Sequence, residues 1–165
     1  MKIIFTSLII LIGLQTVGQE YRYSAGLRGG YSSGITFEAY LDEYNAFKGL
    51  MSWRDKGMQF TGMFEHYKPI FTKKSDHFFL YYGIGGHIGY TRWYKKYYSE
   101  DQYYTYYENV ASPVFGIDGI VGLEFRLYKV PLAFDLDYKP FVELYGQTAF
   151  RSVFNDFAFG IKYNF

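Results

Sequence analysis

The sequence predicts an all-β fold, namely an eight-stranded antiparallel up-and-down β-barrel. Large apolar residues alternate with small or polar ones along nearly the whole chain after Glu20, which is the pattern of β-strands with two different faces. Turn-forming residues divide this pattern into about eight segments of strand length, the number expected of a small barrel. No window of about 18 consecutive apolar residues follows, so no membrane-spanning helix is predicted. With 165 residues, one domain is expected.

The first residues predict a cleavable signal peptide over 1–18, which leaves 19–165 as the β-barrel domain. Lys2 supplies a positive charge, an apolar stretch of about 12 residues follows, and Thr16 and Gly18 place small side chains where a signal peptidase cleaves. A membrane anchor is the alternative, but the apolar stretch is much shorter than the ~20 residues that a spanning helix needs. The chain is therefore predicted to be exported and then processed.

Four strands are predicted between residue 21 and residue 67. Segments 31–34 (YSSG) and 42–45 (DEYN) carry the Ser, Gly, Asp and Asn residues that favour turns. Segment 54–57 (RDKG) is the signal of a tight β-hairpin. The four strands are 21–30, 35–42, 46–54 and 58–67.

Four longer strands are predicted in the rest of the chain. The longest connection between them is the polar segment 93–112. Pro140 falls inside the seventh strand, where it cannot donate a hydrogen bond to a neighbour. We therefore predict a β-bulge or a local twist at residues 139–141, which leaves the face assignment of 141–145 open by one residue. The four strands are 78–92, 114–127, 132–145 and 153–165.

The size of the barrel predicts which face of the strands lies outside. The interior of an eight-stranded barrel is only just wide enough for side chains to fill it. The apolar face carries many large rings, which would overfill this lumen, whereas the polar face interleaves glycines with charged residues. The rings are therefore predicted on the outside, in lipid, so that the barrel is transmembrane. The rings include Phe37, Phe47, Trp53, Phe60, Phe64, Tyr82, Phe115, Phe125, Phe134, Tyr138, Phe157 and Phe159.

The charged residues of the polar face predict an ion-pair network in the lumen. Both signs occur there in similar numbers, and buried charges must pair. Arg54, Glu143 and Asp156 lie on this face as well. The predicted network consists of Arg22, Arg28, Glu38, Lys48, Glu65, His87, Asp118, Glu124, Arg126, Asp135, Asp137, Lys139 and Lys162.

The predicted signal peptide, the alternating strands and the terminal FGIKYNF resemble the small outer-membrane β-barrel proteins of diderm bacteria, the OmpX-like and OmpA-barrel-like group. The resemblance covers the whole mature chain. It implies an outer-membrane location with both barrel termini in the periplasm, so that segment 93–112 becomes an extracellular loop. It also implies that the barrel-assembly machinery reads the last strand, through Phe159, Ile161, Tyr163 and Phe165.

His87 and the pair Asp135 and Asp137 are the candidates for chemistry in the lumen. His87 could act as a general base with Asp118 or Glu124 of the next strand, or it could be one member of the hydrogen-bond network. The Asp-x-Asp pair could bind a metal, but the neighbouring basic residues favour an ion-pair ladder. The chain has no cysteine for a thiolate site, and no His-x-Ser pair of the kind expected in lipid-modifying outer-membrane enzymes. We expect no enzyme activity, no metal and no cofactor.

The polar segment 93–112 is the candidate for surface interactions. It is interpreted as a hairpin that protrudes beyond the membrane, with a polar tip at 99–102. Tyrosine gives amphipathic contact area at low entropy cost, which suits the binding of a surface glycan or a protein. The alternative is that the tyrosines only stack across the strands and touch lipopolysaccharide. The candidate binding residues are Tyr97, Tyr98, Tyr103, Tyr104, Tyr106 and Tyr107.

Together these features predict a monomeric barrel with a packed polar lumen and a structural or surface-interacting role. Its expected partners are outer-membrane lipid, lipopolysaccharide and the assembly machinery. Loss of Lys2 with the signal peptide would leave equal numbers of acidic and basic residues, so no nucleic-acid partner is predicted. Three alternatives remain: a narrow porin-like channel for ions or small solutes, a lipid-modifying outer-membrane enzyme, and a soluble ligand-carrying barrel.

Overall fold

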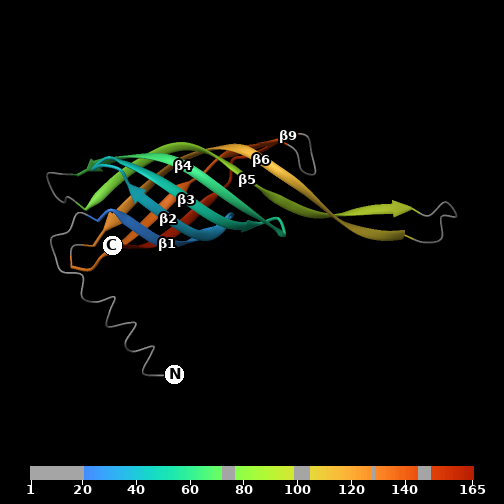
Figure 1. Cartoon of the computed structure of the whole chain (residues 1–165), viewed down its shortest axis with the longest axis horizontal. Coiled ribbons are helices and arrows are strands. Elements are labelled where there is room, and N and C mark those ends of the chain that lie inside the picture. Colours follow the sequence, from blue (N-terminus) through green and yellow to red (C-terminus); the bar gives the residue numbers. More distant parts are fainter. Residues whose placement is uncertain (1–20, 72–76, 99–104, 128, 145–149) are drawn as a thin grey trace, which may run out of the picture.

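The computed structural model describes residues 21–71, 77–98, 105–127, 129–144 and 150–165. These residues fold into a closed barrel of antiparallel strands, with a hairpin that projects from one end (Figure 1). None of them belongs to a helix that could cross a membrane. The predicted signal peptide lies outside the described residues.

Ten strands form the barrel wall: β1 (Tyr23–Gly30), β2 (Ser33–Tyr40), β3 (Asn45–Arg54), β4 (Gly57–Ile70), β5 (Phe78–Tyr98), β6 (Thr105–Arg126), β7 (Leu132–Tyr138), β8 (Phe141–Leu144), β9 (Phe150–Val153) and β10 (Phe157–Asn164). Consecutive strands pair up to β6, and the ring closes because β10 pairs with both β1 and β7. β7 and β8 pair with two successive parts of β6, and β9 pairs with β8. The predicted antiparallel barrel is confirmed, but the described residues form ten strands instead of eight. The seventh predicted strand is broken at Pro140, and a short extra strand, β9, lies almost wholly before the predicted start of the last strand at residue 153.

The break in the seventh predicted strand lies at Pro140, as its missing N–H predicts. β7 and β8 nevertheless keep one register against β6. On the other side, where β7 pairs with β10 and β8 pairs with β9, the register changes by one residue. Tyr138 and Phe141 are three positions apart in the chain, whereas their partners Phe157 and Val153 are four positions apart. The bulge predicted at 139–141 therefore lies on the opposite side of this strand pair, at residues 154–156 between β9 and β10. The alternation of β7 continues into β8, so Phe141 and Glu143 face the lumen.

Two predicted turns have the expected local chemistry. Asp55 and Lys56 join β3 to β4 with positive φ angles of 49° and 56°, which is the geometry of a tight type I′ hairpin. In the turn between β2 and β3, one carboxylate oxygen of Asp42 accepts hydrogen bonds from the backbone N–H groups of Tyr44 and Asn45, each at 2.8 Å. These short turns keep neighbouring strands antiparallel.

The polar segment 93–112 is largely strand instead of loop. β5 and β6 pair continuously from Phe78 and Phe125 to Tyr98 and Thr105. The pairing of β4 with β5 ends at Tyr90, and within the described residues β5 pairs beyond this point with β6 alone. The two strands therefore project from the barrel as the expected hairpin (Figure 1).

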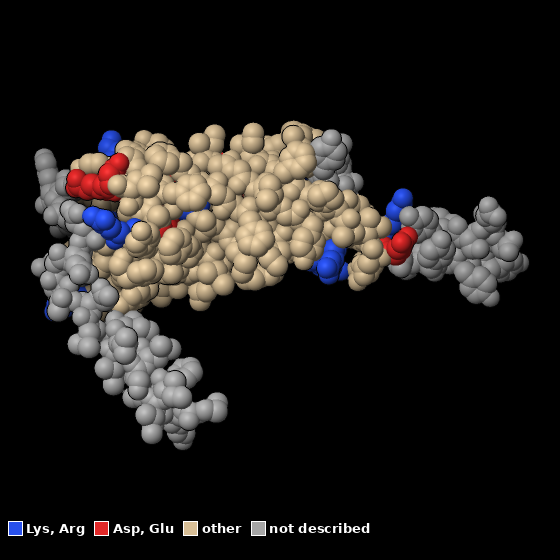
Figure 2. All heavy atoms as spheres, in the orientation of Figure 1, with Lys and Arg blue, Asp and Glu red and all other residues tan. Residues whose placement is uncertain are grey.

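The large rings lie on the outside of the barrel, as the sequence predicts. Of the twelve predicted exterior rings, Phe125, Phe134 and Tyr138 are half-buried and the others are exposed. Between the two ends of the barrel the visible surface is almost entirely free of charged atoms (Figure 2). The lumen still admits a few rings, since Tyr67 and Tyr81 are fully buried inside it.

Glycines make room for the largest lumen side chains. A Cβ atom added at Gly122 would lie 2.5 Å from the Tyr81 ring, and one added at Gly116 would lie 2.6 Å from Cε1 of His87. Glycine on the polar face of one strand therefore accommodates a bulky side chain from the next strand. This agrees with the small-beside-large packing that a narrow lumen requires.

Candidate functional site

The lumen holds two clusters of buried polar side chains. The first cluster lies inside the end of the barrel where β1 begins and β10 ends. The second lies toward the end that carries the β5–β6 hairpin. The first cluster consists of Glu38, Lys48, Glu65, Glu124, Asp135 and Lys162.

Two lysines bridge the four carboxylates of the first cluster. Lys162 Nζ lies 3.0 Å from Glu38 Oε1 and 3.2 Å from Asp135 Oδ2. The same ammonium contacts Glu124. Lys48 Nζ lies 3.1 Å from Glu38 Oε1 and reaches the fourth carboxylate, that of Glu65. Because each ammonium has at least two carboxylates around it, loss of either lysine would leave buried negative charge without a counterion.

Polar and aromatic neighbours hold the carboxylates of this cluster in place. The Tyr67 hydroxyl donates a hydrogen bond to Glu65 at 3.0 Å. Arg126 Nε donates to Glu124 at 2.6 Å, and the guanidinium lies over the Phe79 ring with its carbon 4.2 Å from the ring centroid. Arg126 is half-buried and closes the cluster toward the barrel end.

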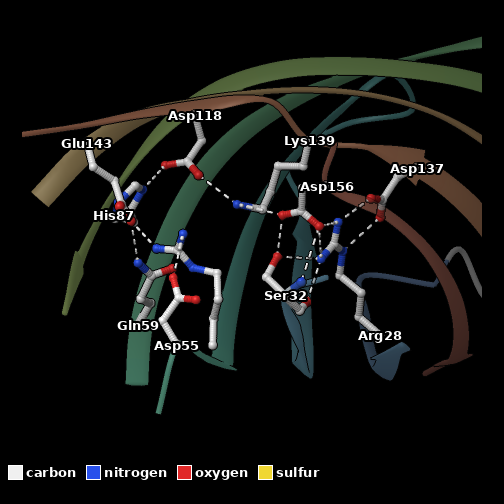
Figure 3. Close-up of polar contacts among 11 residues, drawn as sticks. Arg28, Ser32, Asp55, Gln59, His87, Asp118, Asp137, Lys139, Glu143 and Asp156 are labelled. Carbon is white, nitrogen blue, oxygen red and sulfur yellow. Dashed lines mark hydrogen bonds and ion pairs between the residues drawn. The ribbon is translucent and has the colours of Figure 1, made fainter. Parts of the chain in front are cut away.

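The second cluster is a chain of polar contacts that crosses the lumen (Figure 3). At one end, Arg28 donates two hydrogen bonds to Asp137, at 2.5 and 3.1 Å, and also contacts Asp156 at 3.3 Å. Ser32 hydrogen-bonds to both Arg28 and Asp156. Lys139 continues the chain, 3.5 Å from Asp156. The members are Arg28, Ser32, Arg54, Gln59, His87, Asp118, Asp137, Lys139, Glu143 and Asp156.

His87 links the middle of this chain to its other end. Its Nδ1 lies 2.6 Å from Asp118, which also accepts a hydrogen bond from Lys139 at 2.7 Å. Its Nε2 lies 3.3 Å from Glu143. Glu143 in turn contacts Arg54. Both ring nitrogens of His87 thus face carboxylates.

The chain joins strands that are not neighbours in the sheet. Arg54 of β3 reaches Glu143 of β8, and Arg28 of β1 reaches Asp137 of β7. The Arg54–Glu143 contact therefore connects opposite walls, whereas the Arg28–Asp137 contact spans one intervening strand, β10. Such an arrangement cross-links the barrel from inside.

Arg22 is the exception among the predicted lumen residues. It precedes β1 and is exposed at the barrel end, so it does not join either cluster. The strand alternation predicts Arg22 inside, but the wall does not enclose that position. The other predicted residues lie in the two clusters or, like Arg126, in contact with them.

Several members of the second cluster are not part of the predicted network. The alternation places Arg54, Glu143 and Asp156 on the polar face, and all three are buried in the lumen. Ser32 lies in a predicted turn, and nothing in the sequence indicates that its hydroxyl reaches Asp156. Gln59 donates a hydrogen bond to Glu143 at 2.9 Å, which only the fold reveals.

The structure assigns ionic partners to the Asp-x-Asp pair. Asp135 contacts Lys162 in the first cluster, whereas Asp137 contacts Arg28 in the second. The two carboxylates thus lie on one face but belong to different clusters. Each has the basic partner that an ion-pair ladder requires.

The remaining predicted sites lie on the exterior and on the hairpin. Phe159, Ile161 and Phe165 are exposed and Tyr163 is half-buried, on and just after β10, so the assembly role stays a prediction. Tyr103 and Tyr104 lie outside the described residues. The side chains of the other four candidates, which lie in β5 and β6, are not among those described; they are Tyr97, Tyr98, Tyr106 and Tyr107.

No protein-family model matches the chain, and no curated protein matches it. Among solved structures, the chain is similar to the crystal structure of the N-terminal β-barrel domain of Pseudomonas aeruginosa OprF. The two sequences are 11% identical, the TM-score is 0.48, and the match covers 87% of this chain and 95% of that chain. At this identity and TM-score, the likeness assigns neither a family nor a function to the chain.

Proposed function

We propose that the protein is an integral β-barrel of the outer membrane of a diderm bacterium, with a structural or cell-surface interaction role and no catalytic activity. The observation that carries this proposal is a closed barrel whose exterior is apolar and whose charges are paired inside. Water would have to cover many exposed rings at once, and monomeric soluble proteins rarely expose contiguous apolar patches of more than a few hundred Å². A lipid environment removes this cost.

The orientation of the barrel follows from the same proposal. Both described ends of the chain lie at one end of the barrel, and the β5–β6 hairpin projects from the other (Figure 1). Outer-membrane barrels have short periplasmic turns and longer extracellular loops. We therefore place the two barrel termini in the periplasm and the hairpin outside the cell.

The filled lumen favours a structural role over a channel. The second cluster connects opposite walls through paired charges, so an ion would have to displace several buried ion pairs to pass. The protein, extracted in detergent and reconstituted in planar bilayers, should show heat-modifiable migration on gels and no stable single-channel conductance. Migration that does not change on heating would contradict the barrel proposal, and steady conductance would identify a pore.

The interaction role is assigned to the tyrosine-rich segment 93–112. The described part of this segment projects from the barrel, and in the proposed orientation it lies outside the cell. Deletion of residues 97–107 should leave the heat-modifiable barrel intact and abolish binding in a glycan array or a cell-adhesion assay. Binding that survives the deletion would exclude this segment as the binding site.

A further inference from the structure

A groove crosses the outside of the barrel over β3, β4, β5 and β6 and ends at Leu144 of β8. It has a volume of about 700 Å³, and bulky apolar side chains such as Phe47, Phe60 and Phe115 line it. A second hollow of about 330 Å³ shares Gly49 and Phe60 with it and continues toward β2. The exterior is therefore indented along a line that runs across the strands.

The strand register explains the floor and the walls of the groove. Gly49, Gly62 and Gly86 lie directly opposite one another on three adjacent strands, so none of the three adds a side chain of its own to the wall. The Phe47 ring lies over Gly62, where an added Cβ would be 3.3 Å from Cζ of the ring. Phe60 and Ile88 pair with each other on the hairpin side of these glycines, and their side chains form one side of the groove. The floor of the groove is thus glycine backbone, which the Phe47 ring covers in part at Gly62.

Packing within the barrel does not require a glycine at every position of this floor. A Cβ atom added at Gly49 would have its nearest neighbour at 3.8 Å, an ordinary contact distance. By contrast, a Cβ atom added at the lumen residue Gly116 would lie 2.6 Å from His87. Glycine in a strand interior often marks a place where a ligand approaches the backbone closely.

Two cationic side chains lie above the groove, toward the hairpin. Arg92 is on the exterior of β5, six residues beyond Gly86, and its backbone N–H donates to the carbonyl of Asp55 at 3.3 Å. Lys56 belongs to the same turn as Asp55, with its Nζ 4.4 Å from the centroid of the Tyr94 ring. The Asp55 carboxylate is engaged by Arg54 and Arg151, and the described residues give neither Arg92 nor Lys56 a carboxylate partner.

The distance between the cations and the groove matches one membrane leaflet. Six residues of strand span roughly 20 Å, which a strand tilt of about 40° reduces to roughly 15 Å along the membrane normal. This is about half of the ~30 Å hydrocarbon core. With Arg92 and Lys56 at the level of the headgroups, the groove lies where an acyl chain of the same leaflet ends.

We infer that the groove holds an acyl chain of a phosphorylated glycolipid of the outer leaflet, the lipid A part of lipopolysaccharide, and that Arg92 and Lys56 bind its phosphate. This inference rests on the proposed function, which places the hairpin end outside the cell. The cations select an anionic headgroup, because guanidinium and ammonium groups form charge-assisted hydrogen bonds with phosphate. The apolar groove takes up the chain below it.

The test compares two exterior glycines that both have room for a larger side chain. Gly49→Leu fills the groove, whereas Gly29→Leu adds the same side chain on β1, where the nearest atom to a new Cβ would be at 3.9 Å. Native mass spectrometry of the detergent-extracted protein with added lipid A should show at least tenfold weaker binding for Gly49→Leu and no change for Gly29→Leu. The double variant Arg92→Gln/Lys56→Gln should bind lipid A no more tightly than it binds dephosphorylated lipid A.

Wild-type affinity in Gly49→Leu would overturn the inference, and so would binding of phosphatidylglycerol as tight as that of lipid A. A dimer of the wild-type protein that Gly49→Leu dissociates would assign the groove to self-association instead. Heat-modifiable migration of the wild type and of every variant is recorded first. A wild type without it would contradict the membrane barrel itself, whereas a Gly49→Leu chain without it has not folded, and Gly49→Val is then measured in its place.

Discussion

At the scale of single residues, Lys162 has the largest number of ionic partners in the first cluster. Its ammonium is buried and contacts Glu38, Glu124 and Asp135. A buried ion pair is weak evidence for stability compared with a hydrophobic pair, but removal of one partner alone is strongly destabilising. Lys162 is therefore the position where the lumen network is most easily tested.

We predict that Lys162→Met lowers the free energy of unfolding by about 3–5 kcal/mol, because three buried carboxylates lose their shared counterion. The measurement is urea unfolding of the protein in lipid vesicles. Lys129→Met, at an exposed position between β6 and β7, is the control and should stay within about 0.5 kcal/mol of the wild type. Equal stability of the two variants would mean that the first cluster does not stabilise the barrel.

The turn between β2 and β3 is expected to make a pH-dependent contribution to the stability of the fold. Hydrogen bonds from the Asn45 side chain and from the Tyr44 backbone lower the pKa of the Asp42 carboxyl group. This carboxylate therefore contributes stability above its unfolded pKa of about 3.9, and the contribution is lost as the pH falls through the lower, folded value. An NMR titration of Asp42 should show the lowered midpoint, and Asn45→Ala should move it upward. A midpoint that is unchanged in Asn45→Ala would assign the shift to another cause.

At the scale of the strands, the break between β7 and β8 has a chemical cause that can be removed. The Pro140 carbonyl accepts a hydrogen bond from the Gly119 N–H at 2.9 Å, but proline has no N–H with which to return the bond. In an antiparallel pair of this kind, both bonds are made between opposite residues.

Pro140→Val should therefore supply the missing donor to β6 and stabilise the barrel by about 0.5–1.5 kcal/mol. Hydrogen exchange of the barrel in detergent should show new protection at residue 140, and β7 and β8 should behave as one strand. Faster exchange in this region, or lower stability, would show that the bulge at 154–156 requires the proline.

At the scale of the whole molecule, the exposed apolar surface distinguishes a membrane protein from a soluble barrel. Ile84 is 66% exposed on β5, and its partners on the two neighbouring strands, Phe64 and Gly119, are uncharged. In water, a charge at so exposed a position would change stability by only about 0.5 kcal/mol. In lipid, the same charge would have to leave water.

Ile84→Arg should cost about 2–4 kcal/mol of folding free energy in lipid vesicles, the range for a charge on the lipid face near the midplane. Val130→Arg, in the exposed turn between β6 and β7, is the matched control and should be close to neutral. If Ile84→Arg is also neutral, the exterior faces water, and the soluble barrel becomes the better interpretation.

The alternation of side chains was sufficient to predict the faces of the strands. Phe37 and Glu38 are neighbours in the chain, yet one is exposed on the exterior and the other is fully buried in the lumen, as the period of two requires. The tight turn at Asp55 and Lys56 follows in the same way from residues adjacent in the sequence. These features depend on local geometry, which a sequence expresses directly.

The sequence by itself thus determined a closed antiparallel barrel with rings outside and charges inside. Only the tertiary structure decided which charges meet, as when Arg54 of β3 reaches Glu143 on the opposite wall. It also excluded Arg22 from the lumen and moved the bulge to 154–156. The physical reason is that alternation fixes the side of the wall on which a residue lies, whereas its height along the barrel depends on the stagger of all the strands together.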